Sequence, residues 1–510
     1  MKFATIHLKH AVHNNQRHQI FQRNISFRTR MYRAPFISLT LLLSACHMHL
    51  SPNDKLSSDS SETVKHASKH NIYVTLSALQ HPRILQKYGG AYYNTTLERL
   101  LAQIVHKLAR VSQNPQQHYS VTILNSESIN AFAQPNGSIY ITRGMLALAN
   151  DSSEVAAILA HEIAHITANH GILRLRKKAE LKDKNHFSSP LLSDERGKLH
   201  NPIQNKQQFT QFLRNQELEA DSIALEMLKK AGYDPFASLR FLQSMEAYSV
   251  FRNLLNTTKT SSDFLANHPT TPQRIRLVKE KARNITTVSI GERDRDSFLK
   301  SIDGMIFAGS FPTGFVRDNQ FIHQQLGVAF GVPNNFTIEN SAHTVWASGP
   351  DNIAIRFDAI ARPFALSASE YLKSGWIIGL DESSVHPITI QGYPGAHARA
   401  ANAHWQFDVV VIFFKKHAFR FLTAAPHHSQ HFEEIATKTI QSFHALSSSQ
   451  FKKLKPLRIR VVRVQQGESV ASLANKMQTA THKETLFRIL NALSPTQTLR
   501  AGTDVKIISE

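Results

Sequence analysis

Two histidines and a glutamate have the residue types and the spacing needed to bind and use a metal ion. His161, Glu162 and His165 form the pattern His-Glu-x-x-His. On a helix, residues four apart project from one face about one turn apart, so both imidazoles can bind the same Zn²⁺. Glu162 falls beside them, where its carboxylate can take a proton from water without being a ligand. This spacing indicates metal-assisted hydrolysis.

The ends of the surrounding segment are typical of a helix. Asp151 followed by Glu154 resembles a capping box, and Gly171 is the expected stop. The motif alone leaves an alternative open, because two histidines at this spacing also occur on helix surfaces and in protein cores. A second group of residues is needed to decide between the two interpretations.

Such a group follows in a second segment with helical periodicity, Glu217-Leu-Glu-Ala-Asp221. Glu217 can supply a third, oxygen ligand and leave a fourth position open for water, as catalytic zinc requires. Asp221, one turn later, can accept the remaining N–H of a ligand histidine, which we expect to be His161. Taken by themselves, Glu217, Glu219 and Asp221 are better explained as an acidic, solvated helix face.

The joint pattern resembles a known family. His-Glu-x-x-His followed about 50 residues later by Glu-x-x-x-Asp is similar to the gluzincin metallopeptidases of the HtpX and prenyl-protein-endopeptidase family, and within it to the β-barrel assembly-enhancing proteases. The resemblance covers residues 73–280 and implies one Zn²⁺ per chain, held by His161, His165 and Glu217, with Glu162 as general base. Further matching segments are 81–90, 130–133, 139–144, 231–235 and 268–274.

A His-Pro segment lies near the site in this family, so His268 is the first candidate for a transition-state donor or a gating fourth ligand, and Arg274 is the second. The alternative is a helix-start histidine without a catalytic role. The strand around Asn130–Phe132 is a candidate edge for an extended substrate. We expect the other histidines to be surface residues, and the basic cluster Arg174–Lys178 to be solvated or to contact anionic polymers.

The N-terminus has the pattern of an export signal. A basic stretch is followed by a short apolar run and by Leu43-Ser-Ala-Cys46, which resembles the bacterial lipobox. We therefore predict a signal peptide over 1–46, with translation starting at Met31 as an alternative, lipidation of Cys46, and a flexible tether over 47–72. A chance cysteine after an apolar stretch is the competing interpretation. The resemblance favours the outer membrane, because His47 stands where an inner-membrane retention signal would usually have Asp.

The composition narrows the possible classes of protein. The chain has 510 residues, of which 42% are hydrophobic and 19% charged, and this excludes a chain that is disordered overall. Its one cysteine excludes an internal disulfide framework, a zinc site built from several thiolates and an iron–sulfur cluster. Residues 1–46 hold seven basic residues and no acidic one, and the remaining +14 of the net charge of +21 is scattered, so we expect no nucleic-acid partner.

Apolar periodicity and breakers divide the mature chain into three parts. We predict an α+β multidomain protein: a mainly helical zincin-type domain with a small β-sheet over 73–285, an α+β domain of unknown role over 290–450, and a small βααβ domain over 457–510. The last part resembles a LysM module, which makes peptidoglycan a candidate partner. Residues 182–204 are polar and contain turn residues, so they are a candidate lid.

These features predict a zinc-dependent endopeptidase of the bacterial cell envelope. Its expected substrates are misfolded or stalled envelope proteins, and its expected location is the periplasm, anchored by lipid to the inner leaflet of the outer membrane. The main alternative is a non-enzymatic envelope lipoprotein, acting as a chaperone or a peptidoglycan-tethering module. An enzyme that cuts peptidoglycan cross-links is a third candidate.

Overall fold

The computed structural model describes residues 77, 79–186, 202–254, 264, 268–285, 291–310, 313–479 and 482–510. The signal peptide with Met31 and Cys46, the tether over 47–72 and the centre of the candidate lid lie outside these residues. Where the structure is described, no helix is long and apolar enough to cross a membrane. The expected α+β multidomain fold is confirmed.

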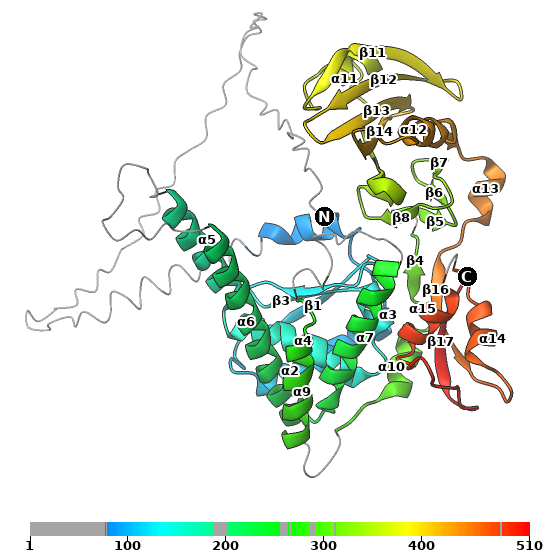
Figure 1. Ribbon diagram of the computed structural model, residues 1–510. Helices are drawn as coiled ribbons and strands as arrows, with labels where there is room; N and C mark the ends of the chain where they lie inside the picture. Colours follow the sequence, from blue (N-terminus) through cyan, green and yellow to red (C-terminus); the bar gives the residue numbers. More distant parts are fainter. Residues whose placement is uncertain are drawn as a thin grey trace, which may run out of the picture.

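The first part of the chain is a bundle of helices around one buried helix, α4 (Figure 1). Every residue of α4 from Ser152 to Ile166 is buried, which is why this stretch is apolar and Ala-rich on all sides rather than amphipathic. The bundle comprises α2 (Thr95–Val111), α3 (Arg143–Leu148), α4 (Ser152–Thr167), α5 (His170–His186), α6 (Pro202–Ala231), α7 (Phe236–Leu254) and α9 (Pro272–Ile285).

The start of α4 is fixed by its own cap and by α7. Asp151 is the N-cap residue and accepts a hydrogen bond from the backbone N–H of Glu154. The Glu154 carboxylate accepts one from the N–H of Asn150, and Arg240 of α7 donates to both acids. The predicted helix start is therefore correct, and its position is locked by buried charge pairs.

The end of α4 differs from the expectation. The helix ends at Thr167, and Asn169 adopts a left-handed conformation with φ of 55°. Gly171, the expected stop, lies inside α5 instead.

The candidate lid over 182–204 also differs from the expectation at both of its ends. Helix α5 continues to His186 and α6 begins at Pro202, which leaves only the centre of that segment outside the described structure.

A three-stranded sheet borders the bundle, with the strand order β1–β3–β2. Its strands are β1 (Ser120–Leu124), β2 (Ala131–Ala133) and β3 (Ser138–Thr142); β1 runs parallel to β3 and β2 antiparallel to it. The turn containing Gly137 joins β2 to β3. Gly137 has φ of 91°, and a Cβ there would lie 2.0 Å from the His118 carbonyl oxygen.

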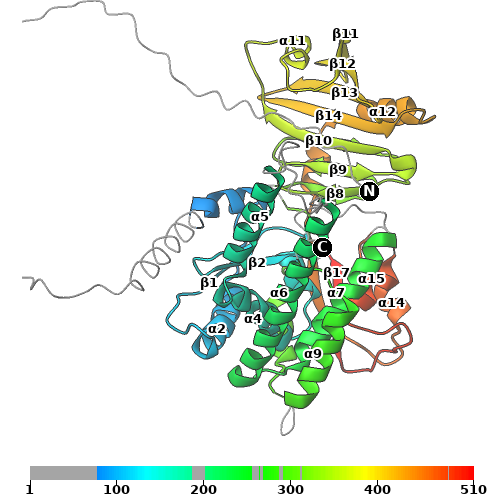
Figure 2. The ribbon, with the colours of Figure 1, turned by 60° about the vertical axis from the view of Figure 1, so that its left-hand side comes forward.

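The middle part is built on a seven-stranded antiparallel sheet, ordered β11–β12–β13–β14–β10–β9–β8, which stands apart from the helical bundle in Figure 2. Separate apolar clusters cover its two faces. Its elements are β8 (Thr337–Asn340), β9 (Val345–Ser348), η1 (Pro350–Asn352), β10 (Ala354–Ala361), α11 (Ala368–Leu372), β11 (Leu380–Ile390), β12 (Tyr393–Ala401), β13 (Trp405–Phe414), β14 (His417–Pro426) and α12 (Phe432–Gln441).

A smaller sheet, ordered β15–β7–β6–β5, packs beside it. Its strands are β5 (Phe315–Arg317), β6 (Gln320–His323), β7 (Val328–Gly331) and β15 (His444–Ala445), and α13 (Ser448–Lys453) follows. Two polar contacts connect the β8–β9 hairpin to the bundle. His343 meets the Gln86 carbonyl oxygen at 2.8 Å, and Arg252 of α7 meets Glu339 at 3.0 Å.

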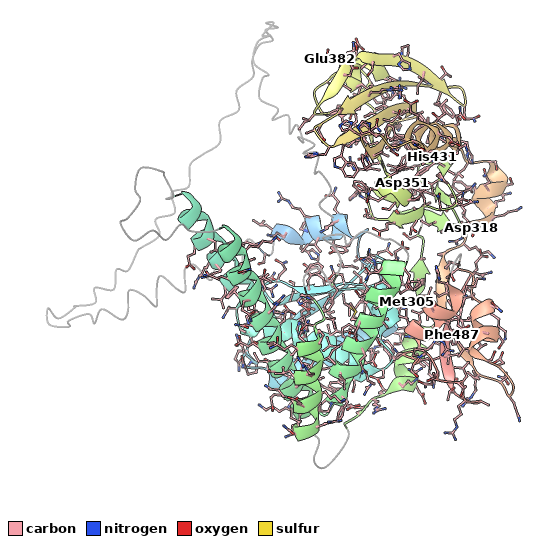
Figure 3. All side chains as sticks on the ribbon, viewed as in Figure 1. Met305, Asp318, Asp351, Glu382, His431 and Phe487 are labelled. Carbon is pink, nitrogen blue, oxygen red and sulfur yellow. The ribbon has the colours of Figure 1, made fainter. Side chains whose placement is uncertain are left out.

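The last part has the predicted βααβ order, with β16 (Leu457–Arg463), α14 (Val470–Asn475), α15 (Lys483–Leu490) and β17 (Asp504–Ser509); α10 (Arg295–Ile302) and β4 (Ile306–Ala308) pack against it. It shares one hydrophobic core with the bundle, to which Met305 and Phe487, labelled in Figure 3, both belong. The buried Lys506 Nζ donates to the Ala147 and Ala149 carbonyls at the end of α3, at 2.8 and 2.5 Å. This unit is therefore fused to the bundle, and its kinship with LysM modules stays a prediction.

Candidate metal centre

Helices α4 and α6 bring the three predicted ligands together. His161 Nε2 lies 3.1 Å from His165 Nε2 and 3.3 Å from Glu217 Oε2, and His165 Nε2 lies 3.5 Å from Glu217 Oε1. All three side chains are buried. The helical spacing of the two histidines thus has the predicted effect, and α6 supplies the carboxylate from a position about 50 residues away.

His268 joins this group from the segment before α9. Its Nδ1 lies 3.0 Å from Glu217 Oε2 and 3.3 Å from His161 Nε2, and its ring stacks on Phe264 with centroids 4.6 Å apart. One ligand atom from each of His161, His165, Glu217 and His268 can be chosen so that all four lie within 4.8 Å of one another. The arrangement can hold a metal ion.

The donor atoms themselves fit a cation. Two imidazole Nε2 lone pairs cannot face each other at 3.1 Å unless a proton or a metal ion lies between them. Burial lowers the pKa of His165 well below its usual value, and the neighbouring charges of His161 and His268 lower it further. Two neutral imidazole nitrogens and a carboxylate oxygen are the ligands that a divalent transition metal prefers.

The outward nitrogen of His161 is held by a buried carboxylate. His161 Nδ1 lies 3.1 Å from Asp221 Oδ1, and Arg274 holds Asp221 through two contacts of 2.7 and 2.8 Å. Burial by itself lowers the pKa of His161, but hydrogen bonds to Asp221 and Glu217 and their charges raise it to about 9. Asp221 therefore lies where its predicted role requires, and Arg274 contacts Asp221 rather than an open cleft.

The outward nitrogen of His165 has a different partner. Its Nδ1 lies 2.8 Å from Nδ1 of His170, whose Nε2 lies 3.3 Å from Glu219 Oε2. His170 is only 1% exposed. The expectation that the remaining histidines lie at the surface is therefore wrong for His170, because the turn at Asn169 directs the chain back beneath α4.

Two arginines contact the carboxylate of Glu217. Arg174 Nη2 lies 2.9 Å from Oε1, and Arg274 Nη1 lies 3.3 Å from Oε2. Burial raises the pKa of Glu217, but the charge of His268 and hydrogen bonds to His161 and His268 bring it well below its usual value. Arg174 was expected on a solvated surface, and this is wrong, because its side chain is partly buried against Glu217 and Gln216.

Glu162 lies at the floor of an open cleft. It is buried, and among the described residues its Oε1 has no hydrogen-bond partner, although His268 Nε2 lies 3.8 Å away. The cleft has a volume of about 520 Å³. Its walls come from the helix at 79–87, from β2 with the following turn, and from the start of α5. A carboxylate oxygen without a partner beside a ligand cluster is suited to accept a proton.

Sequence reasoning missed His170 and Arg174. His170 lies five residues after His165. On an uninterrupted helix that spacing would not bring the two side chains together, because residues three or four apart are neighbours. The left-handed residue at Asn169 brings the two side chains together, and the sequence alone did not predict that turn.

Comparison with known proteins agrees with this geometry. Residues 96–282 match the model of Peptidase family M48. The chain carries an M48 peptidase domain. This domain includes every candidate ligand described above, and the resemblance to metallopeptidases that include β-barrel assembly-enhancing proteases is confirmed.

Several curated proteins share the M48 region. The mitochondrial metalloendopeptidase OMA1 of Schizosaccharomyces pombe is 25% identical over 204 residues, covering 39% of this chain and 58% of that protein. The β-barrel assembly-enhancing protease of Yersinia pestis is 27% identical over 224 residues, covering 42% and 43%. The OMA1 of Danio rerio is 31% identical over 194 residues, covering 35% and 38%. The chain therefore spans about two fifths to three fifths of these relatives' length.

Proposed function

We propose that this protein is a zinc-dependent endopeptidase of the bacterial cell envelope. One observation carries the proposal: His161, His165 and Glu217 converge in a buried cluster, and beside them, at the floor of a cleft, lies a carboxylate oxygen of Glu162 that has no hydrogen-bond partner among the described residues. The match of residues 96–282 to Peptidase family M48 supports the same reaction class.

Zinc is the metal that the donor set favours. Two imidazole nitrogens and one carboxylate oxygen, with room for a fourth donor, form a common catalytic zinc arrangement. When bound, Zn²⁺ supplies a Lewis acid that polarises a peptide carbonyl and lowers the pKa of water to about 7. Asp221 supports this function by fixing the tautomer of His161.

We assign proton transfer to Glu162 and control of access to the metal site to His268. Glu162 Oε1 takes a proton from the attacking water and then delivers it to the leaving amine. His268 Nδ1 faces the ligand atoms, which supports a role as a fourth ligand that substrate displaces. If His268 is instead a transition-state donor, its Nε2 is the group that contacts the substrate oxygen.

The edge of the small sheet offers a binding site for extended substrate. β2 is an outer strand of the sheet, and Phe132, Ala133 and Gln134 line the cleft. A polypeptide laid along β2 would pair main chain to main chain and pass in front of Glu162. Pairing through the main chain depends on few side chains of the substrate, so it suits a protease that acts on unfolded segments of many sequences.

The proposed substrates are misfolded or stalled envelope proteins. The names of the β-barrel assembly-enhancing relatives support a role in envelope protein quality control. In this proposal Cys46 carries a lipid that anchors the chain in the inner leaflet of the outer membrane, facing the periplasm. Residues 457–510 are proposed to contact peptidoglycan, and the domain over 290–450 has no assigned role.

The proposal is tested with Glu162→Gln, which removes the base and keeps every ligand. We expect bound zinc to stay at one per chain while hydrolysis of an unfolded model protein falls by at least 10²-fold. Glu180→Gln is the matched control: Glu180 forms an exposed ion pair with Lys177 on α5, so its loss leaves hydrolysis unchanged. Full hydrolysis by Glu162→Gln would refute the mechanism, and a wild-type protein without zinc would favour the non-enzymatic lipoprotein.

A further inference from the structure

A chain of three side chains extends from the candidate metal site towards solvent. It begins at His165, passes through His170 and ends at Glu219 of α6. The two contacts measure 2.8 and 3.3 Å. His170 is buried, whereas the Glu219 side chain is 60% exposed. The chain therefore runs from a buried ligand to a carboxylate at the surface.

Proton positions along this chain follow from the direction in which His165 faces the site. Its Nε2 points at the other ligand atoms, so a metal takes that lone pair and the ring proton of neutral His165 sits on Nδ1. That N–H donates to Nδ1 of His170, which must then be an acceptor. The proton of neutral His170 therefore sits on Nε2 and is donated to the Glu219 carboxylate.

The local fold holds His170 in this position. Asn169, with φ of 55°, turns the chain between α4 and α5 and directs His170 back beneath His165. Helix α6 supplies both the ligand Glu217 and, two residues later, Glu219. Because one helix carries both carboxylates, any shift of α6 moves the ligand Glu217 and Glu219, the last residue of the hydrogen-bonded series, together.

We propose that His170 and Glu219 are positioning residues of the metal site, which hold His165 in the one tautomer and ring orientation that presents Nε2 to the metal. The inference rests on the proposed zinc site and extends it to two residues outside the ligand set. Outer partners of ligand histidines typically contribute 10–100-fold to metal affinity. His170 is expected to act within that range.

The test compares substitutions that differ only in where they place an acceptor oxygen. The amide oxygen of asparagine falls close to the position of a histidine Nδ1, whereas that of glutamine falls closer to Nε2. Zinc affinity of the full-length protein is measured by competition with a chelator for His170→Leu, His170→Asn and His170→Gln. We expect His170→Leu to bind zinc 10–100-fold more weakly, His170→Asn within about threefold of wild type, and His170→Gln clearly more weakly than His170→Asn.

Two controls distinguish a loss of zinc affinity caused by a displaced His165 from one caused by lower stability of the fold. Urea unfolding of each metal-free variant reports stability, and His81→Leu removes an imidazole hydrogen bond elsewhere in the same domain, so it leaves zinc affinity unchanged. If His170→Leu does not fold, the comparison of His170→Asn with His170→Gln decides. Equal affinities for these two variants, or wild-type affinity in a folded His170→Leu, would overturn the proposal. Wild-type protein that binds no zinc would refute the metal site itself.

Discussion

The two histidines of α4 differ in the residue that contacts Nδ1, the ring nitrogen facing away from the candidate metal site. His161 contacts the buried carboxylate of Asp221, which is itself fixed by two contacts from Arg274. His165 contacts another imidazole, that of His170, and the negative charge of Glu219 is one residue further away and largely exposed to solvent. One histidine of the motif therefore contacts a buried carboxylate directly, whereas the other contacts an imidazole that in turn contacts a carboxylate at the surface.

This difference shows which ligand the fold stabilises most strongly. A buried carboxylate in direct contact raises the basicity of its histidine, and the pKa of about 9 for His161 reflects that contact. An imidazole partner fixes orientation with little added charge, and the pKa of His165 stays well below its usual value. We therefore expect changes on the His161 side to cost more than those on the His165 side.

The largest effect is predicted for Asp221→Ala. This change leaves the buried guanidinium of Arg274 without its paired carboxylate and removes the partner of His161. We expect zinc affinity to fall by about 100-fold and the free energy of unfolding by roughly 3–5 kcal/mol. Chelator competition and urea unfolding measure the two. Asp221→Asn, which keeps an acceptor oxygen, is the control and is expected to lose less of both.

Zinc binding is predicted to release a proton from His161. With a pKa of about 9, His161 is protonated at pH 7 in the metal-free protein, whereas His165 is neutral and Glu217 ionised because their pKa values are lowered. The proton must leave before the metal binds, so affinity rises by roughly tenfold per pH unit towards pH 9 and then levels off. Calorimetry in buffers of different ionisation enthalpy counts the protons. An affinity independent of pH between 6.5 and 9 would contradict the difference between the two histidines.

The smallest effect is predicted for Glu219→Gln. The amide keeps an oxygen that can accept from His170 Nε2, and only an exposed charge is lost. We expect zinc affinity to change by threefold or less and the free energy of unfolding to change by less than about 0.5 kcal/mol. Glu180→Gln, at an exposed ion pair on α5, is the matched control. A loss as large as that of Asp221→Ala would show that the two supports are equivalent.

The sequence predicted which residues converge in the candidate metal site, because their spacing reflects helix geometry. His161 and His165 fall on one face four residues apart, and Glu217 and Asp221 repeat that spacing on α6. The start of α4 and the βααβ order of the last part were likewise correct, since capping residues and alternation are local signals. These are the features that neighbours along the chain determine.

What the sequence did not predict depends on contacts between distant segments. The role of His170 needs the turn at Asn169 and the approach of α6, and Arg174 approaches Glu217 only because α5 and α6 pack together. The buried Lys506, which joins the last part to the end of α3, carries no local pattern that distinguishes it from a surface lysine. Such residues are recognised only once the packing is known.

If one bound zinc ion makes this protein a peptidase, its hydrolytic activity must follow its zinc content, and a metal titration measures both. Wild-type protein is stripped with a chelator and titrated with Zn²⁺ while bound metal and hydrolysis of an unfolded protein are followed in the same sample. We expect hydrolysis to rise in proportion to bound zinc and to saturate at one ion per chain, with no hydrolysis in Glu162→Gln at the same occupancy. Hydrolysis that does not depend on bound zinc, or zinc-loaded protein that hydrolyses nothing, would contradict it.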